Sequence, residues 1–252
     1  MPATLTALPT ALIEGCRVVS VRGRDARSFL QGQLTQDLAL LGPEAFLPGA
    51  LLTPQGRVIA APWLRDTGDA LGLVLPANLA DAVLSRLQRY VLRSKVQLDR
   101  APLDVDGALA LARQIDPDDE HTDLLLACVR AGQPLIDAGT TEEWIPQMLN
   151  LDLLAGISFT KGCYTGQEIV ARTQHLGRIK RRMFRYRATG AAPQPKAALH
   201  LDAQKVGEVV FGATAGADCE FLAVVHLEAR DLALALEGGA PCTPLPLPYA
   251  VP

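Results

Sequence analysis

The chain has few aromatic residues, few cysteines and no long apolar run. Phe, Trp and Tyr make up 5% of its 252 residues, although hydrophobic residues make up 49% and charged residues 20%. This apolar content is enough for a packed core, which excludes a disordered chain. No stretch approaches the roughly 20 apolar residues of a membrane-spanning helix. The N-terminal segment lacks the basic region of a secretory signal, so we expect a cytoplasmic protein.

The cysteines are too widely spaced to form a framework. No two are close in sequence, and there is no C-x-x-C. This argues against a disulfide scaffold and against a zinc or iron–sulfur site built from cysteines. The histidines are equally scattered, and we interpret each as a surface or packed side chain rather than a metal ligand. The five cysteines are Cys16, Cys128, Cys163, Cys219 and Cys242.

Acidic residues are absent between Glu168 and Asp202, although the whole chain has 24 basic and 27 acidic residues and a net charge of −3. Two interpretations of this basic segment remain open. It is either a solvated strand whose charges balance acids elsewhere, or a patch for a polyglutamate tail, a phosphate or RNA. The interleaved Phe184 and Tyr186 are too few to diagnose RNA. Seven basic residues fall within positions 172–187: Arg172, Arg178, Lys180, Arg181, Arg182, Arg185 and Arg187.

The N-terminal hundred residues predict an α+β arrangement. An alternating strand around Val19 and Val21 ends at Gly23, and a helix is expected to begin near Asp25. Two strands flank a turn at residues 54–56. A strand at 71–76, an amphipathic helix over 77–92 and a strand over 94–100 follow. This order predicts helices covering one face of a sheet.

The remainder of the chain changes in character. Residues 116–121 predict an acidic turn, and residues 124–136 a buried strand followed by a turn. A short helix capped by Thr141 and interrupted by Pro146 is expected next. After about residue 181, short strands separated by Gly, Pro and Asp predict a small β-barrel with an extended, proline-rich tail. We therefore expect an α+β region over 1–180 and a barrel with its tail over 181–252.

The segment KGCYTGQEIVAR, residues 161–172, contains the cysteine of most interest. Thr165 and Glu168 fit a capping box, with Thr165 as the N-cap of a helix. Cys163 then lies two residues before the helix, near unpaired N–H groups and the positive end of its dipole. Lys161 adds a cation, and these effects predict a thiol pKa below the usual value of about 8.5.

The residues alone leave two roles open for Cys163. The flanking Gly162 and Gly166 have no side chains to shield the sulfur, which favours a thiol that a partner or ligand approaches. The alternative is a small buried residue in a tight turn.

Three blocks of the sequence resemble one family. KGCYTGQEIVAR, preceded by IPQMLNLDLLAGISFT, resembles the signature of the YgfZ family of folate-binding proteins, which act in iron–sulfur cluster assembly and repair. GRDARSFLQGQLTQDL and RYVLRSKVQL match two further family blocks in the same order. The family is similar in fold to the glycine-cleavage T-protein, a tetrahydrofolate-dependent aminomethyltransferase. The resemblance covers most of the chain and implies a folate-binding α+β region with helices on antiparallel sheet, followed by a barrel.

The resemblance also implies a cofactor, partners and site residues. The cofactor would be tetrahydrofolate or a derivative. The partners would be [4Fe–4S] client or assembly proteins, including a radical enzyme that methylthiolates tRNA. Cys163 would be the functional thiol, tuned by Lys161. The other motif positions are Gly162, Tyr164, Thr165, Gly166, Gln167, Glu168 and Arg172, and the expected folate contacts are Arg57, Lys95 and Arg172.

Two departures from the family pattern shape the expectation. Ala60 and Ala61 stand where the T-protein has paired acids, and aminomethyl transfer needs a carboxylate. The segment over 101–122 is shorter than in longer members, so part of the folate-site wall would be missing. We therefore expect an accessory protein rather than an enzyme. The alternatives are a one-carbon transferase, an RNA-binding module over 172–187, and a thiol-redox protein that needs a resolving thiol from elsewhere.

Overall fold

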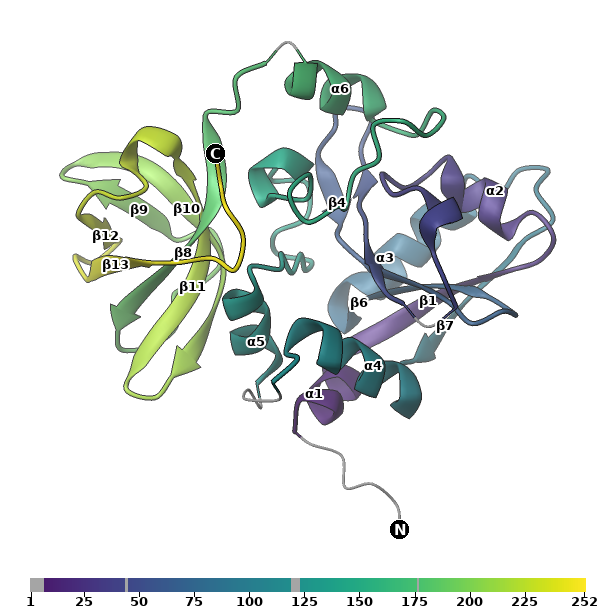
Figure 1. Ribbon diagram of the computed structural model, residues 1–252, viewed down its shortest axis with the longest axis horizontal. Coiled ribbons are helices and arrows are strands. Elements are labelled where there is room, and N and C mark those ends of the chain that lie inside the picture. The colour runs from purple at the N-terminus through teal and green to yellow at the C-terminus, as the bar shows by residue number, and fades with distance from the viewer. Residues whose placement is uncertain (1–6, 44, 119–122, 176) are drawn as a thin grey trace.

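The computed structural model describes residues 7–43, 45–118, 123–175 and 177–252. An antiparallel sheet with its helices lies beside a closed barrel, and α5 stands between the two (Figure 1). The expected α+β region with antiparallel sheet and C-terminal barrel is thus confirmed. None of the described helices is long and apolar enough to cross a membrane.

The five-stranded sheet has the order β2-β5-β6-β1-β7, with every neighbouring pair antiparallel. Its strands are β1 (Cys16–Arg22), β2 (Leu47–Pro48), β5 (Trp63–Asp66), β6 (Leu71–Pro76) and β7 (Gln97–Pro102). The helices of this region are α1 (Ala7–Gly15), α2 (Ala26–Gln31), α3 (Ala77–Gln88), α4 (Val105–Ile115), α5 (Leu124–Ala131) and α6 (Gln167–His175), with 3-10 turns η1 (Leu38–Leu40) and η2 (Pro146–Leu149). The alternation of Val19 and Val21 places both side chains of β1 in the core.

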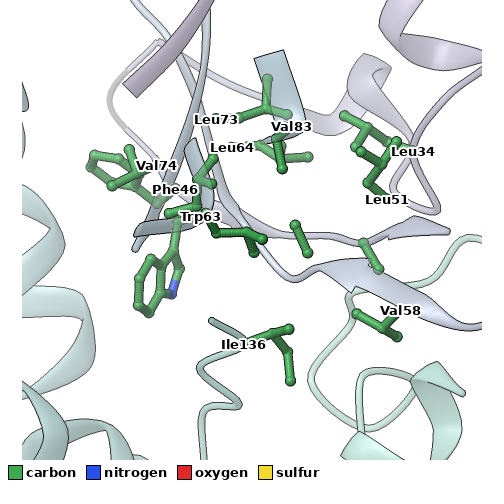
Figure 2. Close-up of a cluster of buried hydrophobic side chains, with 14 of the residues drawn as sticks. Leu34, Phe46, Leu51, Val58, Trp63, Leu64, Leu73, Val74, Val83 and Ile136 are labelled. Carbon is green, nitrogen blue, oxygen red and sulfur yellow. The ribbon is translucent and has the colours of Figure 1, made fainter. Parts of the chain in front are cut away.

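A short two-stranded ribbon extends the core toward the start of α6. It consists of β3 (Leu51–Leu52) and β4 (Val58–Ala60), joined by a turn at residues 53–56. Figure 2 shows buried side chains of the sheet, of α3 and of this ribbon gathered in one cluster, with Val83 of α3 beside Leu73 and Leu64. The ribbon is therefore fixed by apolar packing, and its turn has a defined position.

The barrel closes in the order β10-β11-β8-β13-β12-β9. Its strands are β8 (Arg181–Thr189), β9 (Ala198–Leu201), β10 (Gln204–Ala215), β11 (Asp218–His226), β12 (Leu234–Leu236) and β13 (Pro241–Leu245), with the 3-10 turn η3 (Leu227–Ala229) after β11. Tyr186 and Phe221 are fully buried inside and stack with ring centroids 5.8 Å apart. Outward side chains of the barrel, including Met183 and Leu222, belong to the core of the first region. The two regions therefore pack as one body.

Two expected elements of the middle segment are wrong. Residues 124–131 form helix α5 rather than a strand, because Asp123 caps it by accepting from the N–H of Leu126 at 2.8 Å and Gly132 ends it in a left-handed conformation. Thr141 is not a cap: its hydroxyl donates to the carbonyl of Ile59 at 2.9 Å, and the expected helix is the 3-10 turn η2. Part of the acidic turn expected at 116–121 lies outside the described residues.

Candidate functional site

Lys161 anchors the KGCYTGQE segment to the loop that follows α2. Its Nζ donates to the carbonyls of Gln31 at 2.7 Å, Leu34 at 2.8 Å and Gln36 at 2.7 Å. An ammonium has three N–H donors, so all three are used. The same Nζ lies 5.3 Å from the ring centroid of Tyr164. The hydrogen bonds of Lys161 are thus made to backbone carbonyls, which gives this residue a positioning role in the loop.

Two opposing effects set the charge of this anchor. Burial lowers the pKa of Lys161 to about 8, while the carboxylate of Asp37 raises it. The pKa of Asp37 is itself lowered, first by the backbone N–H of Ala39 and then by the side chain of Gln31. Lys161 therefore remains mainly an ammonium at neutral pH.

Further hydrogen bonds join three loops around the anchor. The hydroxyl of Thr35 donates to the carbonyl of Gly156 at 2.6 Å and accepts from the N–H of Ala50 at 2.8 Å. The side chain of Gln36 donates to the carbonyls of Pro48 and Ala155. These two buried polar residues are not among the predicted site residues. The sequence carried no clear signal for them, because both lie outside the apolar stripe that Phe29, Leu30, Leu34 and Leu38 form at helical spacing.

Glycine packing fixes where α6 begins. Gly166 has a φ of +82°, and a Cβ there would lie 2.6 Å from the carbonyl oxygen of Thr53. Gly56 has a φ of +73°, and a Cβ there would lie 2.8 Å from Cβ of Ile169. These left-handed, crowded positions suit only glycine. The 53–56 turn and the start of α6 therefore touch backbone to backbone.

The expected capping box is not formed. Because Gly166 is left-handed, it cannot be the first helical residue, and α6 begins at Gln167. The N–H of Thr165 donates to the carbonyl of Gly32 at 3.3 Å, which holds the motif against the end of α2. Glu168 is exposed and pairs with Arg172 at 2.9 Å, one helical turn further along α6.

Cys163 is the one exposed cysteine of the five. Burial raises the pKa of Cys16 to about 12 and that of Cys242 to about 11, and it also raises the pKa of Cys128 and of Cys219. These four thiols are shielded and kept protonated. A Cβ added at Gly162 would meet nothing within 4 Å, so the chain beside Cys163 is open. The interpretation of Cys163 as a small buried packing residue is therefore wrong.

The three expected folate contacts do not form one cluster. Arg57 and Arg172 come from adjacent segments, because Gly56 packs against Ile169 of α6. Arg57 donates to the carbonyl of Glu143, and both arginines are exposed. Lys95 lies elsewhere, where its backbone N–H donates to the carboxylate of Asp25 at 2.7 Å.

Three arginines of the basic segment form ion pairs with buried carboxylates of the fold. Arg182 forms a buried bidentate ion pair with Asp152, with N–O distances of 2.9 and 2.8 Å. Arg185 and Arg187 both pair with Glu220, which is fully buried and also pairs with Arg130 of α5. Burial would raise the pKa of Glu220, but the three arginines hold it down at about 2. These charges therefore fix the barrel to the first region and are not a free anion-binding patch.

The positions of the two expected transferase acids hold alanines, and no metal cluster is found among the described residues. Ala60 is fully buried in β4 and Ala61 is half-buried, so neither position offers a carboxylate. No group of three or more His, Cys, Asp or Glu side chains in the described segments lies together as a metal site.

The fold is that of the glycine-cleavage aminomethyltransferases. The crystal structure of aminomethyltransferase T from Bartonella henselae superposes with a TM-score of 0.69 over 92% of this chain and 83% of that one, at 16% identity. At this identity the likeness shows the fold alone.

Sequence relatives define the family. No protein-family model matches the chain. The chain is 31% identical over 263 residues to the tRNA-modifying protein YgfZ of Enterobacter sp. (strain 638), covering 82% of this chain and 80% of the relative. It is 28% identical over 239 residues to the protein of the same name from Hamiltonella defensa, covering 73% and 71%. The chain belongs to the YgfZ family.

Proposed function

We propose that this protein supports iron–sulfur enzymes that modify tRNA, and that the thiol of Cys163 is the group through which it acts. The observation that carries the proposal is the exposure of this thiol on a loop whose backbone is held by Lys161 on one side and by Thr165 on the other. The relatives' name, tRNA-modifying protein, supports the link to tRNA. A rigid loop presents the sulfur to a partner at little cost in conformational entropy.

The proposed thiol acts together with groups from a partner. A [4Fe–4S] cluster is normally held by four thiolates, so Cys163 alone does not hold one. The other four cysteines are buried and provide no further ligands at the surface. Cys163, after losing its thiol proton, therefore serves as a single thiolate ligand toward a cluster whose other ligands the client enzyme provides. This assigns the protein an accessory role in which the client supplies the catalytic machinery.

Complementation tests this role. A strain lacking its own relative of this protein receives wild type, Cys163→Ser or Thr160→Ser, and methylthio-modified nucleosides of its tRNA are measured by mass spectrometry. Thr160 is exposed on the same loop, so its variant is the matched control. We expect wild type and Thr160→Ser to restore the modification and Cys163→Ser to fail. Full restoration by Cys163→Ser would refute the thiol role. Failure of folded wild type would refute the role in tRNA modification.

We also propose that a tetrahydrofolate binds beside the Cys163 loop through its glutamate carboxylates. Arg57 and Arg172 are exposed guanidinium groups on adjacent segments, and their present partners are a carbonyl and a surface carboxylate. Such surface contacts are weak and exchange readily for a ligand carboxylate. The two arginines therefore fit the anionic tail. Because Ala60 and Ala61 carry no acid, the bound folate would not be a substrate for aminomethyl transfer.

Calorimetry with folates of different tail length tests this assignment. Arg57→Ala/Arg172→Ala is compared with Arg22→Ala/Arg100→Ala, which also removes two exposed arginines that pair with carboxylates. We expect the first pair of substitutions to lower the affinity for triglutamyl-tetrahydrofolate about tenfold, and the affinity for the monoglutamate by less. Equal affinities in both double variants would refute the tail site. No binding of either folate would remove the folate proposal and leave the Cys163 test unaffected.

A further inference from the structure

The loop between α3 and β7 presents a leucine that neither backbone geometry nor packing explains. The N–H of Ser94 donates to the carbonyl of Val91 at 2.8 Å, which closes a turn over residues 91–94. Leu92 follows Val91 in this turn with a φ of +42°, and 89% of it is exposed. A turn with positive φ at this position favours glycine, because a Cβ strains the backbone. Leu92 gains no burial in return, so its side chain points to a contact outside the chain.

The same loop carries a cluster of unpaired cations. No acid occurs between Asp81 and Asp99, a span that holds Arg86, Arg89, Arg93 and Lys95. Arg86 is engaged, since it lies over the ring of Tyr90 at 5.7 Å and donates to the carbonyl of Leu52. The other three are exposed, and within the described segments their side chains form no ion pair or hydrogen bond. In a chain of net charge −3, this concentration indicates an anionic partner.

A shallow hollow of about 790 Å³ lies under this loop. Tyr90 and Leu92 give it an aromatic and an apolar wall, and Ser28, Ser94 and Asp25 give it hydroxyl and carboxylate groups. It is lined by Asp25, Ser28, Tyr90, Leu92, Arg93 and Ser94. An unpaired base of RNA is recognised by this combination: a flat face packs on aromatic and apolar side chains, and the base edge forms hydrogen bonds. The cations on the rim would hold the adjacent phosphates.

We propose that the hollow and the 89–95 loop form a binding site for an unpaired nucleotide of RNA. The base occupies the hollow, with its phosphates on Arg89, Arg93 and Lys95. This site goes beyond the proposed accessory role. Its binding of RNA depends on neither the Cys163 thiol nor a client enzyme, so it can be measured with the purified chain. It also replaces residues 172–187 as the RNA-binding surface, since Arg182, Arg185 and Arg187 are engaged in internal ion pairs.

Helix α2 connects this site to the Cys163 loop. Asp25 and Ser28, at its start, line the hollow. Gln31 and Gly32, at its end, accept hydrogen bonds from Lys161 and from the N–H of Thr165. A helix of six residues is about 9 Å long. RNA held in the hollow would therefore lie within a few nucleotides of the exposed thiol.

Binding of purified tRNA to the full chain, measured by filter retention between about 50 and 200 mM salt, tests the site. Arg93→Ala/Lys95→Ala is compared with Arg178→Ala/Lys180→Ala, which removes two exposed charges near the barrel. Thermal unfolding confirms that both are folded. We expect the first pair to lower the affinity for tRNA at least about tenfold. It should also reduce the slope of log affinity against log salt concentration by about 1.4, the value for two contacts to single-strand phosphates. The control should stay within about twofold.

Two further probes distinguish nucleotide recognition from general attraction to polyanions. Leu92→Gly is expected to lower the affinity for a single-stranded RNA oligonucleotide. The affinity for a fully paired RNA duplex should be unchanged, because only an unpaired base enters the hollow. Equal weakening by both charge pairs, or no retention at low salt, would overturn the proposal. Unchanged tRNA binding by Leu92→Gly, combined with lost tRNA modification in cells, would assign the loop to a protein partner and also overturn it.

Discussion

Replacing Gly166 by alanine tests whether the contact between two turns positions the Cys163 loop. Alanine at a φ of +82° is strained by about 1–2 kcal/mol. Its Cβ would also lie 2.6 Å from the carbonyl oxygen of Thr53 and 3.1 Å from Cβ of Leu52. Relieving such overlap typically costs about 1–3 kcal/mol. The expected loss of unfolding free energy is therefore about 2–5 kcal/mol, which lowers Tm by about 10 °C in a chain of this size.

Gly162→Ala is the matched control, because it is the same substitution on the other side of Cys163. A Cβ at Gly162 meets nothing within 4 Å, and its φ is not in the left-handed region. Thermal unfolding by circular dichroism and the alkylation rate of the Cys163 thiol are measured for both variants. Gly162→Ala should leave Tm within about 1 °C of wild type. If Gly166→Ala likewise changes neither Tm nor the alkylation rate of Cys163, the packing of the 53–56 turn against α6 does not hold the loop.

Three other variants probe the frame around the site. Lys161→Met should lower the unfolding free energy by about 3 kcal/mol, because three buried carbonyls lose their donor; a loss below about 1 kcal/mol would show that desolvation of the ammonium cancels its bonds. Since the pKa of Glu220 is lowered from 4.5 to about 2, its ionisation stabilises the fold fully above pH 4.5, and this contribution is lost as the pH falls through 2. Glu220→Gln should thus have a lower unfolding free energy than wild type at pH 7 and should lose less of it between pH 4.5 and 2, as measured by urea unfolding. Parallel curves of unfolding free energy against pH for the two proteins would contradict this. Leu92→Gly should leave Tm within about 2 °C of wild type, because relief of backbone strain offsets the added flexibility of the unfolded chain; a larger fall would show that Leu92 packs within the fold.

Elements with a clear local pattern could be predicted from the sequence, and those with a uniform apolar run could not. The alternation in β1 and the amphipathic stripe of α3 each have one period, so their type is unambiguous. LLLACV is apolar on every side, and such a run fits a buried strand or a buried helix equally. The capping residues Asp123 and Gly132 were the signal for a helix.

The directions of charged side chains were beyond local reasoning. The carbonyl partners of Lys161 lie about 125 to 130 positions earlier in the chain, so the sequence around Lys161 could not show which atoms its ammonium bonds. The basic segment was ambiguous for the same reason. Its acidic partners, Asp152 and Glu220, lie 30 to 35 positions away from Arg182 and Arg185 on opposite sides. A charge run therefore indicates a surface only after its distant counter-ions are known.

The proposed RNA site and the Cys163 loop share one support, and this constrains how the protein would assist a client enzyme. Both are attached to α2, which is fixed by Phe29 and Leu30 in the core and by the bond between Asp25 and Lys95. An RNA substrate bound at one end would have a defined distance to the thiol at the other. A client that takes its RNA from this surface would bring its cluster to Cys163 in the same encounter. Loss of the hollow should then reduce tRNA modification while leaving the alkylation rate of Cys163 unchanged, whereas loss of the Lys161 anchor should alter both.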